Sequence, residues 1–274
     1  MTLFRRALLL LLFASAASCA GGQRLVGRSV GGMGAGGLVA ASLVCHAEAA
    51  NPAALALLGR LTLSAGGGLP YGLADLAEMR GVVAVPTPLV CAAARVSRAG
   101  GAYSRFVSFG ADFARRFGPV AVGVGYRGVV HTLAYADRGV SSFSTLGLLF
   151  VPSGRWEVGL SARNVERRRL SRLGRDDSLP TTLWATLLWR AERVFSVCVE
   201  AEKEVGRDPV GRVGISLRPA GGLFFTAGFA SLGEELSAGA GFDWELFGVR
   251  ASVAHHSSLG VSSGAAISFH PRWP

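Results

Sequence analysis

The second half of the chain alternates between apolar and small or polar residues with a period of two. In the stretch 212–218, Val213, Ile215 and Leu217 occupy one face of the expected strand, and arginine, glycine and serine occupy the other. The same alternation recurs in 223–229, 236–245 and 259–269. Successive side chains of a β-strand point to opposite faces of the sheet. Each stretch is therefore expected to form a strand with one apolar face.

Repeated strands of about ten residues joined by short turns are typical of an outer-membrane β-barrel. A sheet that crosses a bilayer must close on itself, because lipid cannot satisfy unpaired backbone groups. The sequence predicts an all-β, transmembrane, antiparallel up-and-down barrel of about 12–14 strands. The range reflects Pro86 and Pro88, which interrupt pairing within 82–96. A periplasmic β-sandwich, with the apolar faces turned inward, is the alternative.

The first twenty residues have the pattern of a secretory signal peptide. Arg5 and Arg6 precede an apolar run over 7–13, which is followed by small residues over 14–18. The apolar run is too short to span a membrane as a helix. Cleavage after Ala20 is expected, and lipidation at Cys19 is the alternative. The predicted location is the outer membrane of a bacterial cell.

Composition supports a single barrel domain and excludes a nucleic-acid-binding protein. The 38 glycines suit a narrow barrel wall and its bulges. The formal charge of +10 comes almost entirely from arginine, and Lys203 is the only lysine. These arginines are dispersed, whereas nucleic-acid binders concentrate basic charge on one face.

If the apolar faces contact lipid, many charged residues point into the lumen. They are Arg163, Arg190, Glu200, Glu202, Arg212, Arg218, Asp243, Glu245 and Arg250. Because both signs occur on neighbouring strands, we expect ion pairs that fill the lumen. A hydrophilic channel lined by these charges is the alternative.

No pattern in the sequence indicates an enzyme, a cofactor or a metal site. His255 and His256 are adjacent on an expected strand, so they point to opposite faces and cannot chelate one ion from one side. Cys45, Cys91 and Cys198 have no metal-binding spacing, and we interpret them as packed side chains rather than as a disulfide framework.

Residues 21–60 form a Gly- and Ala-rich region ahead of the expected barrel, which occupies 61–274. The region contains the glycine-rich run 31–37 and then Asn51, Pro52 and Ala53. Asparagine can cap a helical turn, and proline suits its first position.

Two sets of residues carry a resemblance to a known family. The first is Gly32-Met33-Gly34 followed by Asn51-Pro52-Ala53, and the second is Arg163-Asn164, a connection, and Leu179-Pro180. Together they resemble the FadL-like superfamily of long-chain fatty-acid transporters, and most closely its PorV/PorQ-like branch, which is associated with type IX secretion. The resemblance implies a short N-terminal segment in or across the lumen, with Asn51, Pro52 and Ala53 as a plug motif.

The resemblance leaves two functions open. The first is a secretion-associated or structural barrel that binds exported proteins or secretion-system subunits at the outer membrane, and it predicts long, chemically distinctive surface loops. The alternative is FadL-like uptake of a small hydrophobic ligand, which predicts a pocket of apolar side chains near 51–58.

The longest polar connection, 164–180, is rich in arginine. It contains Arg167, Arg168, Arg169, Arg172 and Arg175. So many guanidinium groups cannot lie in hydrocarbon, so the connection must lie beyond the apolar band. Because arginine binds phosphate and carboxylate in a bidentate manner, we interpret it as a possible contact for anionic membrane lipid or an acidic partner. A solvated loop is the alternative.

Overall fold

The computed structural model describes residues 29–40, 43, 45–134, 136–172, 175–191, 194–219 and 221–271, with the side chains of 30, 31, 136, 137, 172 and 175–178 excepted. The expected signal peptide, with Cys19 and both expected processing sites, lies outside these residues.

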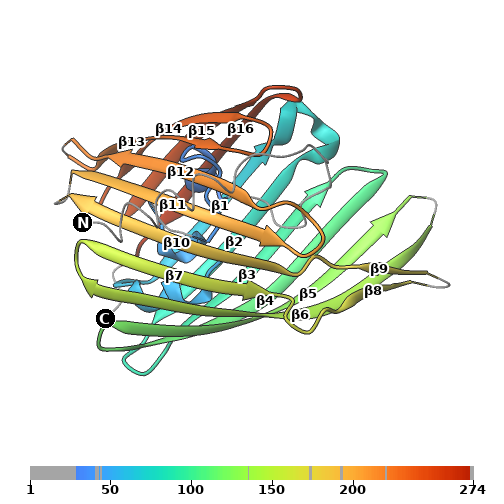
Figure 1. The fold of residues 1–274 in the computed structure, drawn as a ribbon, viewed down its shortest axis with the longest axis horizontal. Helices are drawn as coiled ribbons and strands as arrows, with labels where there is room; N and C mark the ends of the chain where they lie inside the picture. Colours follow the sequence, from blue (N-terminus) through green and yellow to red (C-terminus); the bar gives the residue numbers. More distant parts are fainter. Residues whose placement is uncertain are drawn as a thin grey trace.

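Fourteen antiparallel strands close into a barrel, which confirms the predicted fold class (Figure 1). In order around the ring they are β1 (Thr62–Leu69), β2 (Glu78–Pro86), β3 (Cys91–Gly100), β4 (Ser104–Phe117), β5 (Val120–Leu133), β6 (Ala136–Ser153), β7 (Trp156–Arg163), β10 (Thr182–Ala191), β11 (Phe195–Glu204), β12 (Val210–Leu217), β13 (Leu223–Ala230), β14 (Glu235–Asp243), β15 (Phe247–His256) and β16 (Gly260–Phe269). The β1–β16 ladder completes the ring.

The apolar strand faces point outward, as a transmembrane barrel requires. Val213, Ile215 and Leu217 of β12 are 38%, 40% and 45% exposed, whereas Arg212 and Ser216 on the opposite face are 1% and 2% exposed. A sandwich would bury the first set. The alternation therefore has the orientation expected for a wall in contact with lipid.

The two ends of the barrel differ in the length of their connections. Short turns such as 118–119 and 154–155 lie at the end where β1 begins and β16 ends. Longer connections, including 70–77 and 164–181, lie at the opposite end. We call these the short-turn end and the long-loop end. In outer-membrane barrels the short turns face the periplasm and the long loops face outward.

Part of the 164–180 connection is a hairpin rather than the loop expected from its polar sequence. Strands β8 (Arg169–Arg172) and β9 (Arg175–Ser178) pair with each other, and β8 meets the extended β6 at Val140. Figure 1 shows this hairpin projecting past the neighbouring strands. Leu170 is 2% exposed and packs with Phe143, which gives the hairpin its support.

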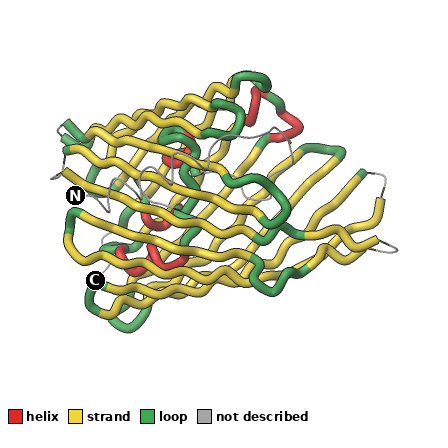
Figure 2. Tube along the Cα trace, in the orientation of Figure 1, coloured by secondary structure: helices red, strands yellow, loops and turns green. Residues whose placement is uncertain are grey.

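Helical structure is confined to short elements. The helix α2 (Val30–Met33) and the 3-10 turns η1 (His46–Glu48) and η2 (Pro52–Leu57) lie inside the barrel, while η3 (Pro70–Gly72) and η4 (Ala74–Leu76) belong to a long-loop connection (Figure 2). Among the described residues, no helix is long and apolar enough to cross a membrane. We refer to the described residues between 29 and 58 as the lumenal segment.

One residue expected to point into the lumen does not. Glu245 lies in the exposed turn between β14 and β15, because β14 ends at Asp243 and the strand alternation ends with it.

Candidate functional site: the lumenal segment

Asn51 attaches the lumenal segment to the barrel wall. Its Nδ2 donates to the carbonyl oxygens of Leu148 on β6 and Leu160 on β7, at 3.2 and 3.3 Å. Its Oδ1 accepts a hydrogen bond from the backbone N–H of Ala53 at 3.0 Å, which caps η2. Asn51 is 1% exposed. One side chain thus fixes the turn and joins it to two strands.

Glycines in the wall make room for this turn. A Cβ at Gly147 would overlap Oδ1 of Asn51, and a Cβ at Gly123 would overlap the backbone of Pro52 and Ala53. Pro52 and Ala53 are themselves buried. The three residues predicted as a plug motif therefore lie against a notch in β5 and β6 that only glycine can form.

The glycine-rich run attaches to the other side of the barrel. The Gly36 N–H donates to Oγ of Ser237 on β14 at 2.7 Å. A Cβ at Gly228 on β13 would overlap the backbone of Gly36, and one at Gly214 on β12 would lie 2.5 Å from the Ala35 carbonyl oxygen. Backbone therefore packs on backbone here, and the lumenal segment contacts opposite walls.

A buried carboxylate provides a third attachment. Glu200 on β11 is 0% exposed and accepts from the N–H groups of Val39 and Ala40, at 3.1 and 2.8 Å. Nη1 of Arg212 lies 3.1 Å from the same carboxylate. Hydrogen bonds to an ionised acceptor are stronger than neutral ones, so this contact holds the segment firmly.

Glu48 supplies the fourth attachment, and sequence reasoning missed it. Its Oε1 accepts from Arg250 Nη1 on β15 at 2.6 Å and from Ser64 Oγ on β1 at 2.5 Å. Nearby, Nη2 of Arg95 donates to the Ala49 carbonyl oxygen at 3.1 Å. One signal was available in the sequence, because Glu48 is the only acidic residue between positions 21 and 60.

Ion pairs occupy the lumen beside the segment, as the charge pattern predicted. Arg212 contacts Glu202 at 2.8 Å as well as Glu200. Trp184 Nε1 donates to Glu202 at 3.0 Å. Arg163 instead donates from Nη2 to Thr182 Oγ1 at 3.0 Å, and its guanidinium lies 5.2 Å from the centre of the Trp184 ring.

Apolar side chains surround η2 toward the short-turn end. Leu55 is fully buried in a cluster with Ala47, Val82, Ala84, Ala93 and Ala114. Ala53 packs with Ala121 and Leu149 in a second cluster. Apolar side chains thus surround η2, and the segment's own side chains fill the space that a pocket for a hydrophobic ligand would need.

The cysteines and His46 of this region are partly or fully buried. The three described cysteines form no disulfide. Burial raises the pKa of the Cys45 thiol and lowers the pKa of the His46 imidazole. His46 Nε2 has no hydrogen-bond partner among the described residues. No group of side chains in the described part of the chain could hold a metal ion.

The second motif of the sequence analysis comes together at the long-loop end. Nδ2 of Asn164, which is 0% exposed, donates to the Leu179 carbonyl oxygen at 3.0 Å and to that of Arg168 at 3.2 Å. Its Oδ1 accepts from the Arg168 N–H at 2.8 Å. Arg163 precedes it and Pro180 follows Leu179, so Asn164 fixes both ends of the connection.

Three of the five arginines in the connection have described side chains. Arg167, Arg168 and Arg169 are consecutive and exposed. The side chains of Arg172 and Arg175 lie outside the described atoms. Three of the five predicted anion-contacting residues thus lie together on an exposed stretch that leads into β8.

Comparisons with known proteins identify the fold. No family model matches the sequence, and no curated protein matches it. Among solved structures, the P. putida toluene transporter TodX matches with a TM-score of 0.71 and 10% identity, over 92% of this chain and 100% of that one. The Ralstonia pickettii toluene transporter TbuX matches at 0.64 and 13%, over 91% and 99%.

A Pseudomonas aeruginosa FadL homologue matches with a TM-score of 0.63 and 10% identity, over 89% of this chain and 98% of that one. At such identities the likeness concerns the fold. A barrel of this kind fits the outer membrane. The chain has the fold of the FadL family of outer-membrane β-barrels.

Proposed function

We propose that this protein lets small hydrophobic molecules pass through the outer membrane, with the lumenal segment as its gate. The observation that carries the proposal is the position of that segment. It lies within a closed barrel, contacts opposite walls, and occupies the apolar surroundings of η2. In this proposal, a molecule crosses the barrel when the segment moves away from the apolar surroundings of η2.

The function of two structural neighbours supports a hydrophobic cargo. TodX and TbuX, which share this fold, are toluene transporters. The buried clusters around η2 consist of alanine, valine and leucine, which a small apolar molecule could contact in place of Leu55.

The attachments differ in strength, which indicates where the gate opens. Leu148 and Leu160 are register partners in the β6–β7 ladder, so their carbonyls stay paired when Asn51 leaves. Two neutral hydrogen bonds contribute about 1–3 kcal/mol in total. Removing one partner from a buried ion pair such as Glu48–Arg250 costs about 3–5 kcal/mol. We therefore expect opening to begin at Asn51 and η2 and to be completed when the rest of the segment leaves the wall.

A reversible lock between segment and wall tests the proposal. A Cβ at Gly34 would lie 3.1 Å from Cβ of Ser252 on β15. Disulfides need about 3.5–4.5 Å, so a shift of a few tenths of an ångström would accommodate the pair Gly34→Cys and Ser252→Cys. The background carries alanine in place of Cys45, Cys91 and Cys198.

The measurement is the initial rate of toluene entry into cells that express the protein. Toluene should enter cells with the reduced double variant faster than cells without the protein. The oxidised double variant should give no such increase, and reductant should restore it. Gly34→Cys alone, treated with the same oxidant, is the matched control. If the oxidised double variant admits toluene as fast as the reduced one, the segment is not the gate. If no variant accelerates entry over cells without the protein, transport itself is wrong.

The second candidate is a barrel that binds exported proteins or secretion-system subunits, as PorV/PorQ-like proteins would. The β8–β9 hairpin and the exposed Arg167, Arg168 and Arg169 favour it, because binding calls for a distinctive surface at the long-loop end. Co-purification of an outer-membrane partner with the wild-type protein, lost when these arginines become glutamine, would support this candidate over transport.

Export to the outer membrane belongs to the same proposal. We propose 1–20 as the signal peptide, 21–60 as the plug region and 61–274 as the barrel. The N-terminal sequence of protein recovered from outer membranes should begin at Gly21, whereas a lipidated Cys19 would indicate an additional anchor.

A further inference from the structure

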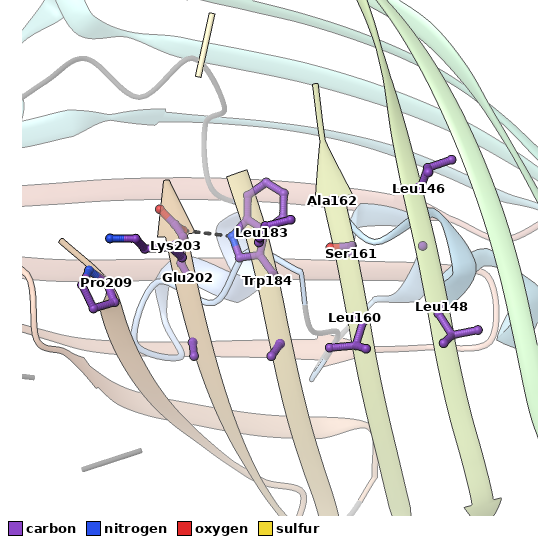
Figure 3. A pocket seen from close by; sticks show the side chains of 13 residues that line it. Leu146, Leu148, Leu160, Ser161, Ala162, Leu183, Trp184, Glu202, Lys203 and Pro209 are labelled. Atoms are coloured by element: carbon purple, nitrogen blue, oxygen red, sulfur yellow. Dashed lines mark hydrogen bonds between the residues drawn. The ribbon is translucent and has the colours of Figure 1, made fainter. Parts of the chain in front are cut away.

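A groove crosses the outer wall of the barrel near the long-loop end (Figure 3). It has a volume of about 520 Å³. Four neighbouring strands contribute to it, namely β6, β7, β10 and β11. Its exposed apolar lining consists mainly of Leu146, Leu148, Leu160 and Leu183.

The strand register explains why a groove forms there. Leu146, Ala162, Leu183 and Lys203 are successive register partners and make one row across the four strands. Leu148, Leu160, Ala185 and Ala201 make the next row on the same face. Alanine is smaller than leucine, so the alanines in the middle of the rows leave a depression between leucine side chains.

One end of the groove carries a cation. Lys203, the only lysine of the chain, lines the groove one residue before β11 ends. Its Nζ donates to the Arg207 carbonyl oxygen at 2.5 Å, which holds the ammonium at the rim. An ammonium group has three donors, so two remain for a ligand. The groove therefore combines an apolar trough with a single positive charge at its end.

We propose that this groove binds one acyl chain of a phosphate-bearing membrane lipid, with the lipid phosphate at Lys203. The leucine and alanine side chains face the bilayer, where the available apolar ligands are acyl chains. A lysine at the end of a transmembrane strand lies at the level of the headgroups, where it attracts anionic lipid. The apolar trough thus matches the acyl chain of such a lipid, and the ammonium group of Lys203 matches its phosphate.

The groove lies directly outside the wall section that holds the gate. Leu148 and Leu160 line it, and their carbonyl oxygens accept the hydrogen bonds of Asn51 on the inner side. The lipid site is nevertheless independent of transport, because it requires no passage through the lumen. Its test therefore measures lipid binding alone.

The test uses the purified full-length barrel in detergent, with phosphatidylglycerol and phosphatidylcholine as competing probes and native mass spectrometry as the readout. The wild type should retain one phosphatidylglycerol in preference to phosphatidylcholine. Filling the trough with Ala162→Leu and Ala185→Leu should lower retention of both lipids about tenfold or more, because it displaces about two buried methylene groups. Lys203→Gln should reduce the preference for phosphatidylglycerol about fivefold.

Matched controls come from the opposite wall. Ala251→Leu on β15 adds the same side chain to an exposed position outside the groove, and Arg98→Gln on β3 removes an exposed charge there. Both should retain lipid as the wild type does. The proposal is overturned if the variant with Ala162→Leu and Ala185→Leu retains as much lipid as the wild type. It is also overturned if Ala251→Leu loses as much lipid as that variant does. A preference that Lys203→Gln leaves unchanged overturns the phosphate contact.

Heat-modifiable gel mobility establishes that each variant is folded. If the variant with both Ala162→Leu and Ala185→Leu does not fold, the single change Ala201→Leu fills the end of the Ala185 row, and retention should fall about fourfold. Unchanged retention in that folded variant also overturns the proposal.

Discussion

Replacing Asn51 with alanine should release the turn at η2 while the barrel remains intact. The substitution removes both hydrogen bonds to the wall and the cap on the Ala53 N–H. The Leu148 and Leu160 carbonyls keep their partners in the β6–β7 ladder, so no wall group is left unsatisfied.

The expected cost can be worked from these contacts. Two neutral hydrogen bonds contribute about 1–3 kcal/mol, and a helix cap contributes about 1 kcal/mol. The free energy of local opening at η2 should therefore fall by about 2–4 kcal/mol. Each 1.4 kcal/mol is about tenfold in an equilibrium constant. The population of the open state should therefore increase by a factor between about thirty and several hundred.

Amide hydrogen exchange of residues 53–58 in detergent-solubilised barrel measures this opening directly, in the regime where exchange follows the open population. Asn51→Ser keeps an acceptor for the cap but loses the donor to the wall, so its exchange rate should lie between those of wild type and Asn51→Ala. Strand amides in β13 serve as the internal reference. Exchange at η2 that is unchanged in Asn51→Ala would refute the assignment of Asn51 as the anchor.

Three further outcomes are expected. Gly147→Ala should accelerate the same exchange, because the added methyl group overlaps the anchoring amide, whereas alanine at the exposed Gly154, which has open space, should not. A triple change of Arg167, Arg168 and Arg169 to glutamine should weaken binding of the barrel to anionic vesicles, and the loss should be larger at low salt than at high salt. The barrel should still assemble. Binding equal to that of the wild type at low ionic strength would leave this stretch as a solvated connection. Burial lowers the pKa of His46 in the folded state, so the undocked state takes up the proton first as pH falls below about 6.5, and protease cleavage of the segment should increase from about pH 7 to about pH 5. A pH profile that the substitution of His46 by glutamine leaves unchanged would assign that increase to another group.

The barrel could be predicted because the alternation of a strand is local. Val213, Ile215 and Leu217 indicate a half-apolar strand without reference to any other part of the chain. The attachments of the lumenal segment could not be predicted in this way. Ala40 and Glu200 are 160 positions apart, and no local pattern joins a backbone N–H to a carboxylate at that distance.

The same limit explains the other differences. The β8–β9 hairpin was missed because its only apolar support on β8 is Leu170, whose packing partners Phe143 and Val129 come from earlier strands. The groove depends on the register of four strands, and neither Ala162 nor Ala185 is unusual within its own sequence. The family resemblance singled out Asn164 and Leu179, and the hydrogen bond between them joins residues fifteen positions apart that border one connection.

The β1–β16 ladder sets an order of events during assembly. Every other ladder of the described ring joins strands that follow one another along the chain, apart from the hairpin between β7 and β10. The first and last strands therefore meet only after the whole chain has been delivered, and such distant contacts form late. The lumenal segment ends just before β1 at Thr62.

When the seam between β1 and β16 closes, the barrel encloses any segment that already lies between its walls. Glu200 and Arg250, which hold the segment, come from strands delivered long after it. A segment left outside at that moment could enter only by threading through an end of the finished barrel. We therefore expect the Glu200 and Arg250 contacts to form before the first strand meets the last, so that the barrel closes around a segment already in place.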